Sequence, residues 1–239
     1  MSEGQQLPRF SPAQVRRRRI LLLGLIVLAV VLVTTWRVRS DGTPDVVPGP
    51  RPAPAAAPAS AAPTSPVVVQ RGSGELEVSA GSSNAPGRGT VLTVRVEVER
   101  GTGVVAQGFA ETVMSTLNDP RSWGHGGDRT FARTDGPADI RVVLASPDTS
   151  AALCRPLVTR GRLSCSVGDR AVITTYRWQG GADEFSDLGV YRSYVVNHEV
   201  GHVLGRPHEG CAGAGRPAPV MQQQTIKVAP CIPNGWPFP

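Results

Sequence analysis

Residues 198–208 read HEVGHVLGRPH, so three of the chain's four histidines lie within eleven residues. On a helix, His198 and His202 lie on one face about one turn apart, because they are separated by four residues. From there both imidazoles can bind one zinc ion at roughly 2.0–2.1 Å. A third histidine, His208, leaves one of four tetrahedral positions open for water, which is typical of a catalytic rather than a structural zinc. The spacing therefore predicts a hydrolytic zinc site.

Two further positions in this segment have predictable roles. Glu199 follows the first ligand directly, and its carboxylate can act as a general base on water without binding the metal itself. Gly205 stands where helices commonly end in a left-handed turn that glycine enters at least cost. Such a turn directs the chain back, so that His208 completes the site. The alternative is a helix that carries surface histidines. The remaining histidine, His125, lies in a WGHGG segment and is interpreted as a solvated loop residue.

The helix that presents His198 and His202 is predicted to begin at Ser186 or Asp187, either of which can cap it, and to run to Leu204. A helix in this position turns the two histidines towards a cleft. Its opposite side is expected to pack in the core and consists of Val196, Val200, Val203 and Leu204.

Hydrophobic periodicity predicts the other elements. Four-residue spacing of apolar side chains predicts a helix over 104–117, ended by Asn118-Asp-Pro120. Alternation predicts strands over 91–99, 129–134, 138–145, 162–166 and 171–178, the last two pairing across a turn at 167–169. This order is typical of a small α/β or α+β domain, of which α+β is favoured, with a loop-rich part after Gly205.

The N-terminal part predicts a membrane anchor. Four arginines at 16–19 precede an uncharged apolar stretch of 17 residues at 20–36, near the lower limit for a membrane-spanning helix. The arginines favour a cytoplasmic N-terminus. A cleaved secretory signal is the alternative, although no Ala-x-Ala-like site follows. The predicted organisation is a basic cytoplasmic tail (1–19), a transmembrane signal anchor (20–36), a Pro/Ala-rich linker (37–67) and an exported domain (68–239).

The net charge of +6 belongs mainly to the N-terminal part. Residues 1–67 carry 8 basic and 3 acidic side chains, whereas residues 68–239 carry 17 basic and 16 acidic ones. The exported domain is therefore nearly neutral, and no nucleic-acid partner is expected for it.

All four cysteines lie in the predicted exported domain, where an even number favours two disulfides. Three pairings are possible. Cys154–Cys165 and Cys211–Cys231 are preferred because each closes a short local loop. Ligation of zinc by cysteine is the alternative, but no C-x-x-C spacing supports it.

With these residues in view, the chain resembles the metzincin zinc endopeptidases. The resemblance is carried by the extended motif at 198–208, by Pro219-Val-Met221-Gln, which is similar to that group's Met-turn, and more weakly by Ala138-Asp-Ile140, which is similar to a core strand. It implies a twisted mixed sheet with two main helices, the active-site helix below it and an edge strand lining the substrate cleft. It also implies that Met221 supports the metal site from beneath.

The sequence departs from the metzincin pattern in two ways. No tyrosine follows Met221, so the additional tyrosine ligand of some members is absent, and no cysteine precedes Cys154, so a cysteine-switch propeptide is not evident. Glu209 follows the third histidine, as in astacins, where this position takes part in buried charge pairing. In this chain a role beside the ligands and a solvated carboxylate both stay open.

The tether and anchor also resemble those of uncharacterised membrane-anchored envelope proteins of high-GC Gram-positive bacteria. Together, the motif and the resemblances predict a membrane-anchored, extracytoplasmic zinc endopeptidase. Its partners would be Zn²⁺, a peptide or protein substrate, and the membrane through one helix. Two alternatives are a non-catalytic, metal-stabilised envelope binding module and a zinc amidase that acts on cell-wall peptides.

Overall fold

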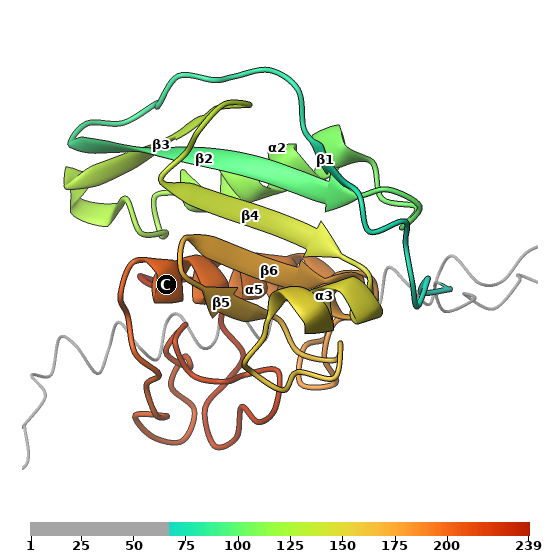
Figure 1. Cartoon of the computed structure of the whole chain (residues 1–239). Helices are drawn as coiled ribbons and strands as arrows, with labels where there is room; N and C mark the ends of the chain where they lie inside the picture. Colours follow the sequence, from blue (N-terminus) through green and yellow to red (C-terminus); the bar gives the residue numbers. More distant parts are fainter. Residues whose placement is uncertain (1–66) are drawn as a thin grey trace, which may run out of the picture. The chain divides into compact units, whose positions relative to one another are not determined.

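A computed structural model of the chain describes residues 67–239 (Figure 1). The predicted cytoplasmic tail, the anchor at 20–36 and the linker up to residue 66 lie outside the described residues. Within 67–239, no helix is both long and apolar enough to cross a membrane. This part of the chain has an α+β architecture, with one open, mixed six-stranded sheet and four α-helices.

Three parallel strands form the middle of the sheet: β2 (Thr90–Glu99), β4 (Ile140–Ala145) and β6 (Arg170–Thr174). The short strand β5 (Cys165–Val167) pairs antiparallel with β6 and forms one edge. Among residues 67–239, one side of β5 has no strand partner, and an extended chain can add to a sheet at such an edge.

The opposite side of β2 is shared by two strands. β3 (Arg129–Arg133) pairs parallel with the first half of β2, and β1 (Leu76–Val78) pairs antiparallel with its last residues. Sequence periodicity predicts β3 but not β1, because three residues are too few to show alternation.

The two longest helices cover the same face of the sheet. α2 (Ala106–Leu117) and α5 (Leu188–Val203) both pack against the alternating apolar residues of β2, β4 and β6, forming one hydrophobic core. The short helix α3 (Pro147–Leu153) lies on the other face, in front of β6 in Figure 1. α5 thus lies directly beneath the strands next to the β5 edge, which places the histidine motif beside that edge.

The prediction of a strand over 171–178 is wrong beyond Thr174, because α4 (Thr175–Gly180) begins there. The Thr174 hydroxyl accepts a hydrogen bond from the Tyr176 N–H and caps the helix, so local capping overrides the apolar alternation. The helix turns Trp178 into the core, where its ring packs edge-on against Phe109 at 4.8 Å. The strand predicted over 162–166 is shorter and shifted to β5, and α2 begins at Ala106 rather than at residue 104.

Side-chain hydrogen bonds and a disulfide hold the part after α5, which contains no helix or strand among the described residues. The Gln224 amide accepts from the Asn234 N–H and donates to its carbonyl, while Asn234 donates to Ala218. Cys211–Cys231 closes this part, and Cys154–Cys165 joins the end of α3 to β5. Both preferred disulfides and the loop-rich C-terminal part are therefore confirmed.

Candidate metal centre

Helix α5 contains His198, Glu199 and His202 and holds them in a partly buried position. Its N-terminus is capped by Asp187, whose carboxylate accepts hydrogen bonds from the N–H groups of Gly189 and Val190. Val196 and Val200 are fully buried in the core, as the sequence predicts. The other side of the helix leaves His198 and Glu199 about 5% exposed, lining a cleft instead of the core.

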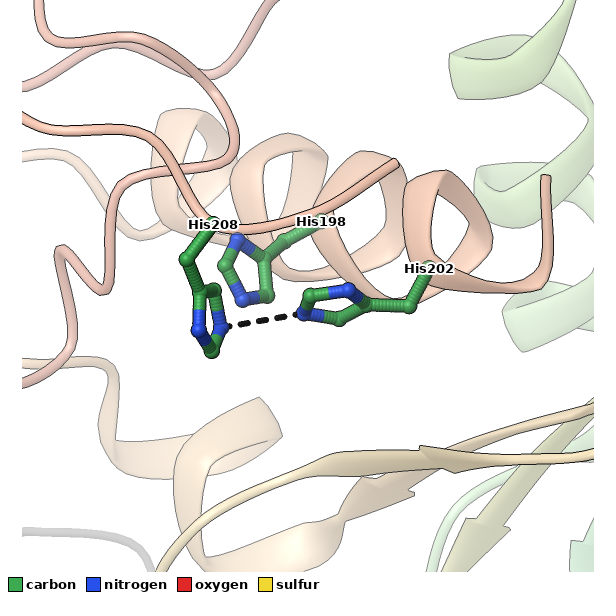
Figure 2. Close-up of side chains that lie close together, drawn as sticks. All are labelled: His198, His202 and His208. Atoms are coloured by element: carbon green, nitrogen blue, oxygen red, sulfur yellow. Dashed lines mark hydrogen bonds between the residues drawn. The ribbon is translucent and has the colours of Figure 1, made fainter. Parts of the chain in front are cut away.

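Three imidazoles converge in this cleft (Figure 2). The Nε2 atoms of His202 and His208 are 3.1 Å apart, and the nearest ring nitrogens of all three histidines lie within 4.8 Å of one another. Ligand atoms at the zinc–nitrogen distance are about 3.4 Å apart in a tetrahedron. The three histidines predicted from the motif are therefore brought together, and their spacing fits a single metal ion.

Backbone carbonyls orient two of the rings. His198 Nδ1 donates to the Val220 carbonyl at 2.8 Å, and His202 Nδ1 donates to the Arg206 carbonyl at 2.9 Å. Each hydrogen bond fixes the tautomer in which Nε2 keeps its lone pair for the cluster. Burial lowers the pKa of His198 to about 3 and lowers that of His202 as well. Both rings are thus neutral at pH 7, the form that binds metal.

Gly205 ends the helix in the expected left-handed conformation, with φ of 79°. Its N–H donates to the His202 carbonyl at 2.9 Å, and the Arg206 N–H donates to Gly201 at the same distance. These two hydrogen bonds close the helix and turn the chain back. The turn brings His208 opposite His202, which is the role predicted for this glycine.

The segment around Met221 forms a tight turn, closed by a hydrogen bond from Gln222 N–H to the Pro219 carbonyl at 2.9 Å. Met221 is 1% exposed and packs against α5 where Gly201 has no side chain. A Cβ atom on Gly201 would lie 2.5 Å from the Met221 sulfur. Together with the hydrogen bond from His198 to Val220, this contact ties the turn to helix α5.

The same turn also holds the third-histidine segment, since the Glu209 N–H donates to the Met221 carbonyl at 3.1 Å. The Glu209 side chain is exposed and makes no ion pair among the described residues. Of the two interpretations left open by the sequence, the solvated carboxylate fits the structure. The backbone of Glu209, rather than its charge, contributes to the site.

Glu199 has no partner that would explain its burial. It makes no hydrogen bond or ion pair with any residue of the described range, and burial raises its pKa to about 8. Its carboxyl oxygens are not among the fully enclosed polar atoms that lack a partner, so they reach the cleft. Partial removal of a carboxyl group from water is still unfavourable, and no side chain of the described range offsets it. A cation among the three histidines would supply the missing partner, which is a second observation that fits a metal ion at this position.

The cleft has a volume of about 540 Å³ and is built from five parts of the chain. Its walls are β5, the loop before β5, the histidine-bearing face of α5, the segment of His208, and the segment after the Met221 turn. The residues that sequence reasoning missed are Leu157, Val158, Thr159, Leu163, Ser164, Ser166, Tyr194, Gln223, Thr225 and Ile226. Most carry no local signal, because their proximity arises only from the fold.

Tyr194 is the exception, since it precedes His198 by four residues and so shares its helix face. Its ring lies 5.2 Å from that of His198, and its hydroxyl donates to the Gln222 carbonyl and accepts from the Gln224 N–H. Tyr194 therefore ties α5 to the segment after Met221. His125 lies outside the cleft, as expected: its ring stacks on Phe238 at 4.5 Å.

Comparison with known proteins gives one match. No curated protein and no solved structure matches this chain. A family model described as "Protein of unknown function (DUF3152)" matches residues 62–231, a range that contains the three histidines, Glu199 and Met221. Because the match covers well over half of its length, the chain belongs to the DUF3152 family.

Proposed function

We propose that this chain is a zinc-dependent endopeptidase with Glu199 as its general base. The observation that carries the proposal is a largely buried carboxyl group that has no partner among the described residues and lines the same open cleft as three converging imidazoles. Neither the carboxyl group nor the histidine cluster contributes evident stability to the fold. Together, the histidines would form a metal site and the carboxyl group would act as a base. This pairing is the arrangement expected for metal-assisted hydrolysis.

His198, His202 and His208 would hold the ion. Three neutral nitrogen ligands and a borderline-soft, four-coordinate preference favour Zn²⁺ over Mg²⁺ or Ca²⁺, which select oxygen ligands. When bound, zinc supplies Lewis acidity, which polarises a carbonyl group and lowers the pKa of a water molecule at the site towards about 7. The hydrogen bonds to Val220 and Arg206 keep two of the rings oriented for it.

A cation held by the three histidines would lower the raised pKa of Glu199 again, so that its carboxylate can remove a proton from the attacking water as the water oxygen bonds to the substrate carbonyl carbon. Glu199 then gives this proton to the leaving nitrogen as the C–N bond breaks, and a carboxylic acid and an amine are released. Met221 touches none of the reacting groups. It supports the site by fixing the turn that holds the His198 and His208 segments.

A peptide substrate is favoured by the edge strand β5, which lines the cleft with one side unpaired. An extended peptide can add to such an edge through backbone hydrogen bonds. The helix, the Met221 turn and an edge strand around one cleft support the resemblance to metzincins at the level of fold. The two disulfides support an extracytoplasmic location, since disulfides persist in oxidising compartments.

The test uses the purified full chain and measures both zinc content and hydrolysis of a peptide library. Wild type is expected to hold one equivalent of zinc and to cleave peptides. Glu199→Ala should keep the zinc and lose about 10²–10⁴-fold in rate. Glu209→Ala is the matched control, because it removes a nearby but exposed carboxylate and should change neither property.

A wild-type chain that binds no zinc, or a Glu199→Ala variant that cleaves as fast as wild type, would refute the proposal. Digestion of cell-wall material in parallel separates peptidase from amidase activity. If the variant keeps the cellular function of the wild type, the protein acts as a binding module instead.

A further inference from the structure

The rim of the cleft carries several exposed apolar side chains. Eight large hydrophobic side chains are exposed in residues 67–239, and three of them line this one cleft: Leu157 at 52%, Val158 at 82% and Ile226 at 60%. Scattered exposed hydrophobic residues are normal, but their concentration at a concave site marks a binding surface. Exposure of this kind costs solubility, so a ligand that covers these side chains is expected.

These residues belong to opposite walls. Leu157 and Val158 lie in the loop that the Cys154–Cys165 disulfide closes, and Ile226 lies in the segment after the Met221 turn. The disulfide fixes one end of the loop to α3 and the other to the edge strand β5. The Thr225 hydroxyl beside Ile226 is held by Tyr191 of α5 at 3.1 Å. Both walls are therefore anchored close to the residues that they present.

The cleft offers a substrate side chain no charge of its own beyond the catalytic group. Apart from Glu199 and the three histidines, its lining contains only apolar side chains, hydroxyls, one disulfide cysteine, one glycine and the amide of Gln223. A charged substrate side chain held within this lining would lose its hydration without gaining an ion pair there, which disfavours its binding. Arg155 and Arg160 lie outside the lining, in an adjoining hollow that Leu157 and Val158 also contact. An apolar side chain would cover the exposed residues of the rim and gain from their burial.

The structure assigns Leu157, Val158 and Ile226 as the residues that select the substrate, by binding a large aliphatic or aromatic side chain next to the bond that is cleaved. This assignment rests on the proposed peptidase function, because it takes the metal and Glu199 as the place of cleavage. It adds the substrate class: peptides with a bulky apolar residue beside the scissile bond, in preference to charged ones.

The test measures binding rather than cleavage. Three hydroxamates that chelate zinc are titrated into the zinc-loaded full chain by calorimetry: acetohydroxamate, which carries only a methyl group, a 4-methylpentano analogue with an isobutyl-type tail, and a succinate-derived analogue with a carboxylate tail. Wild type should bind the branched apolar analogue at least about tenfold more tightly than acetohydroxamate, as expected for burial of two or more methylene groups. It should show no such gain for the carboxylate analogue.

Ile226→Asp and Leu157→Asp should each remove most of this tenfold preference while leaving the affinity for acetohydroxamate unchanged. The matched control is Val105→Asp, which alters a side chain that is 74% exposed and lies outside the cleft. Equal affinity of wild type for the methyl and branched analogues would overturn the assignment, as would an equal loss in the Val105 control.

The outcome also separates this inference from the proposed function. If the chain prefers the branched hydroxamate but cleaves no peptide, the apolar binding site is supported and the peptidase proposal is refuted. If it cleaves peptides without any side-chain preference, the peptidase proposal is supported and the assignment of the selecting residues is refuted. A chain that binds none of the three probes refutes both.

Discussion

Gly201→Ala is the substitution that most directly tests whether the Met221 turn holds the metal site in place. Gly201 lies in α5 between the two histidine ligands, at a position that the HExxH pattern leaves free. An added Cβ atom would lie 2.5 Å from the Met221 sulfur and 2.7 Å from a ring carbon of Trp123. Favourable contacts are about 3.5–4.0 Å, so the methyl group overlaps each neighbour by about 1 Å.

The neighbours have little room to yield. The Trp123 ring is held by a 2.9 Å hydrogen bond from its Nε1 to the Asn197 carbonyl of α5, and Met221 is 1% exposed. Met221 or the helix must therefore shift. Overpacking of this kind costs about 1–3 kcal/mol, and the higher helix propensity of alanine offsets up to about 1 kcal/mol of it. We expect a net loss of about 1–2 kcal/mol in the free energy of unfolding.

A shift of Met221 would also move its neighbour Val220, whose carbonyl accepts the hydrogen bond that orients His198. Loss of such a partner typically lowers metal affinity about 10–100-fold. Urea unfolding would report the stability, and competition with a zinc chelator would report the affinity. The matched control is Gly108→Ala in α2, an exposed glycine with no atom within 4 Å of its added Cβ, which should gain up to about 1 kcal/mol and bind zinc normally.

The reasoning is refuted if Gly201→Ala behaves like Gly108→Ala in both assays. A double-mutant cycle with Met221→Ala tests the cause. If the clash is responsible, the combined loss in stability will be smaller than the sum of the two single losses.

Two further predictions concern a buried carboxyl group of the sheet and the two disulfides. Burial alone would raise the pKa of Glu99, but hydrogen bonds, the strongest from the Ser146 N–H, outweigh it and hold the pKa below 4.5. A folded-state pKa below the unfolded value stabilises the fold above about pH 4.5, and this effect is lost as the pH falls through the lowered pKa. In urea unfolding, Glu99→Gln should therefore be less stable than wild type by about 1–3 kcal/mol at pH 7, and the difference should shrink as the pH is lowered through the acid range. A difference that stays constant with pH contradicts this. Replacing Cys211 and Cys231 by serine should lower the free energy of unfolding by about 3 kcal/mol. It should also weaken zinc binding in the chelator assay, because this disulfide closes the loop that contains the Met221 turn. Loss of the Cys154–Cys165 disulfide should leave the zinc affinity unchanged in the same assay.

The convergence of the three histidines and the end of the helix could be predicted because their relations are local in sequence. A four-residue spacing determines that His198 and His202 share a face, and a glycine after the helix determines where the chain turns back. The disulfides were predictable for a similar reason, since each closes a short loop. In all these cases, helix geometry or loop length restricts the structure before any tertiary contact forms.

The cleft walls could not be predicted in this way. Leu157 and Ile226 become neighbours of the metal site only because β5 forms the sheet edge above α5 and the C-terminal part folds back beneath it. Periodicity also failed at Trp178, where the alternating pattern suits a strand but the Thr174 cap starts a helix. Hydrophobic alternation indicates that one side of a segment is buried, but it does not determine whether a strand or a short helix buries that side.

The Met221 turn shows why recognising a motif is not the same as explaining it. The resemblance places a methionine beneath the site, but the physical reason lies in three contacts that converge on one turn: Val220 orients His198, Met221 accepts from the Glu209 backbone after the third histidine, and its sulfur fills the space left by Gly201. The first and third ligands are therefore positioned by the same few residues. Because the part after α5 has no helix or strand of its own, metal binding to both ends of this arrangement should stabilise it.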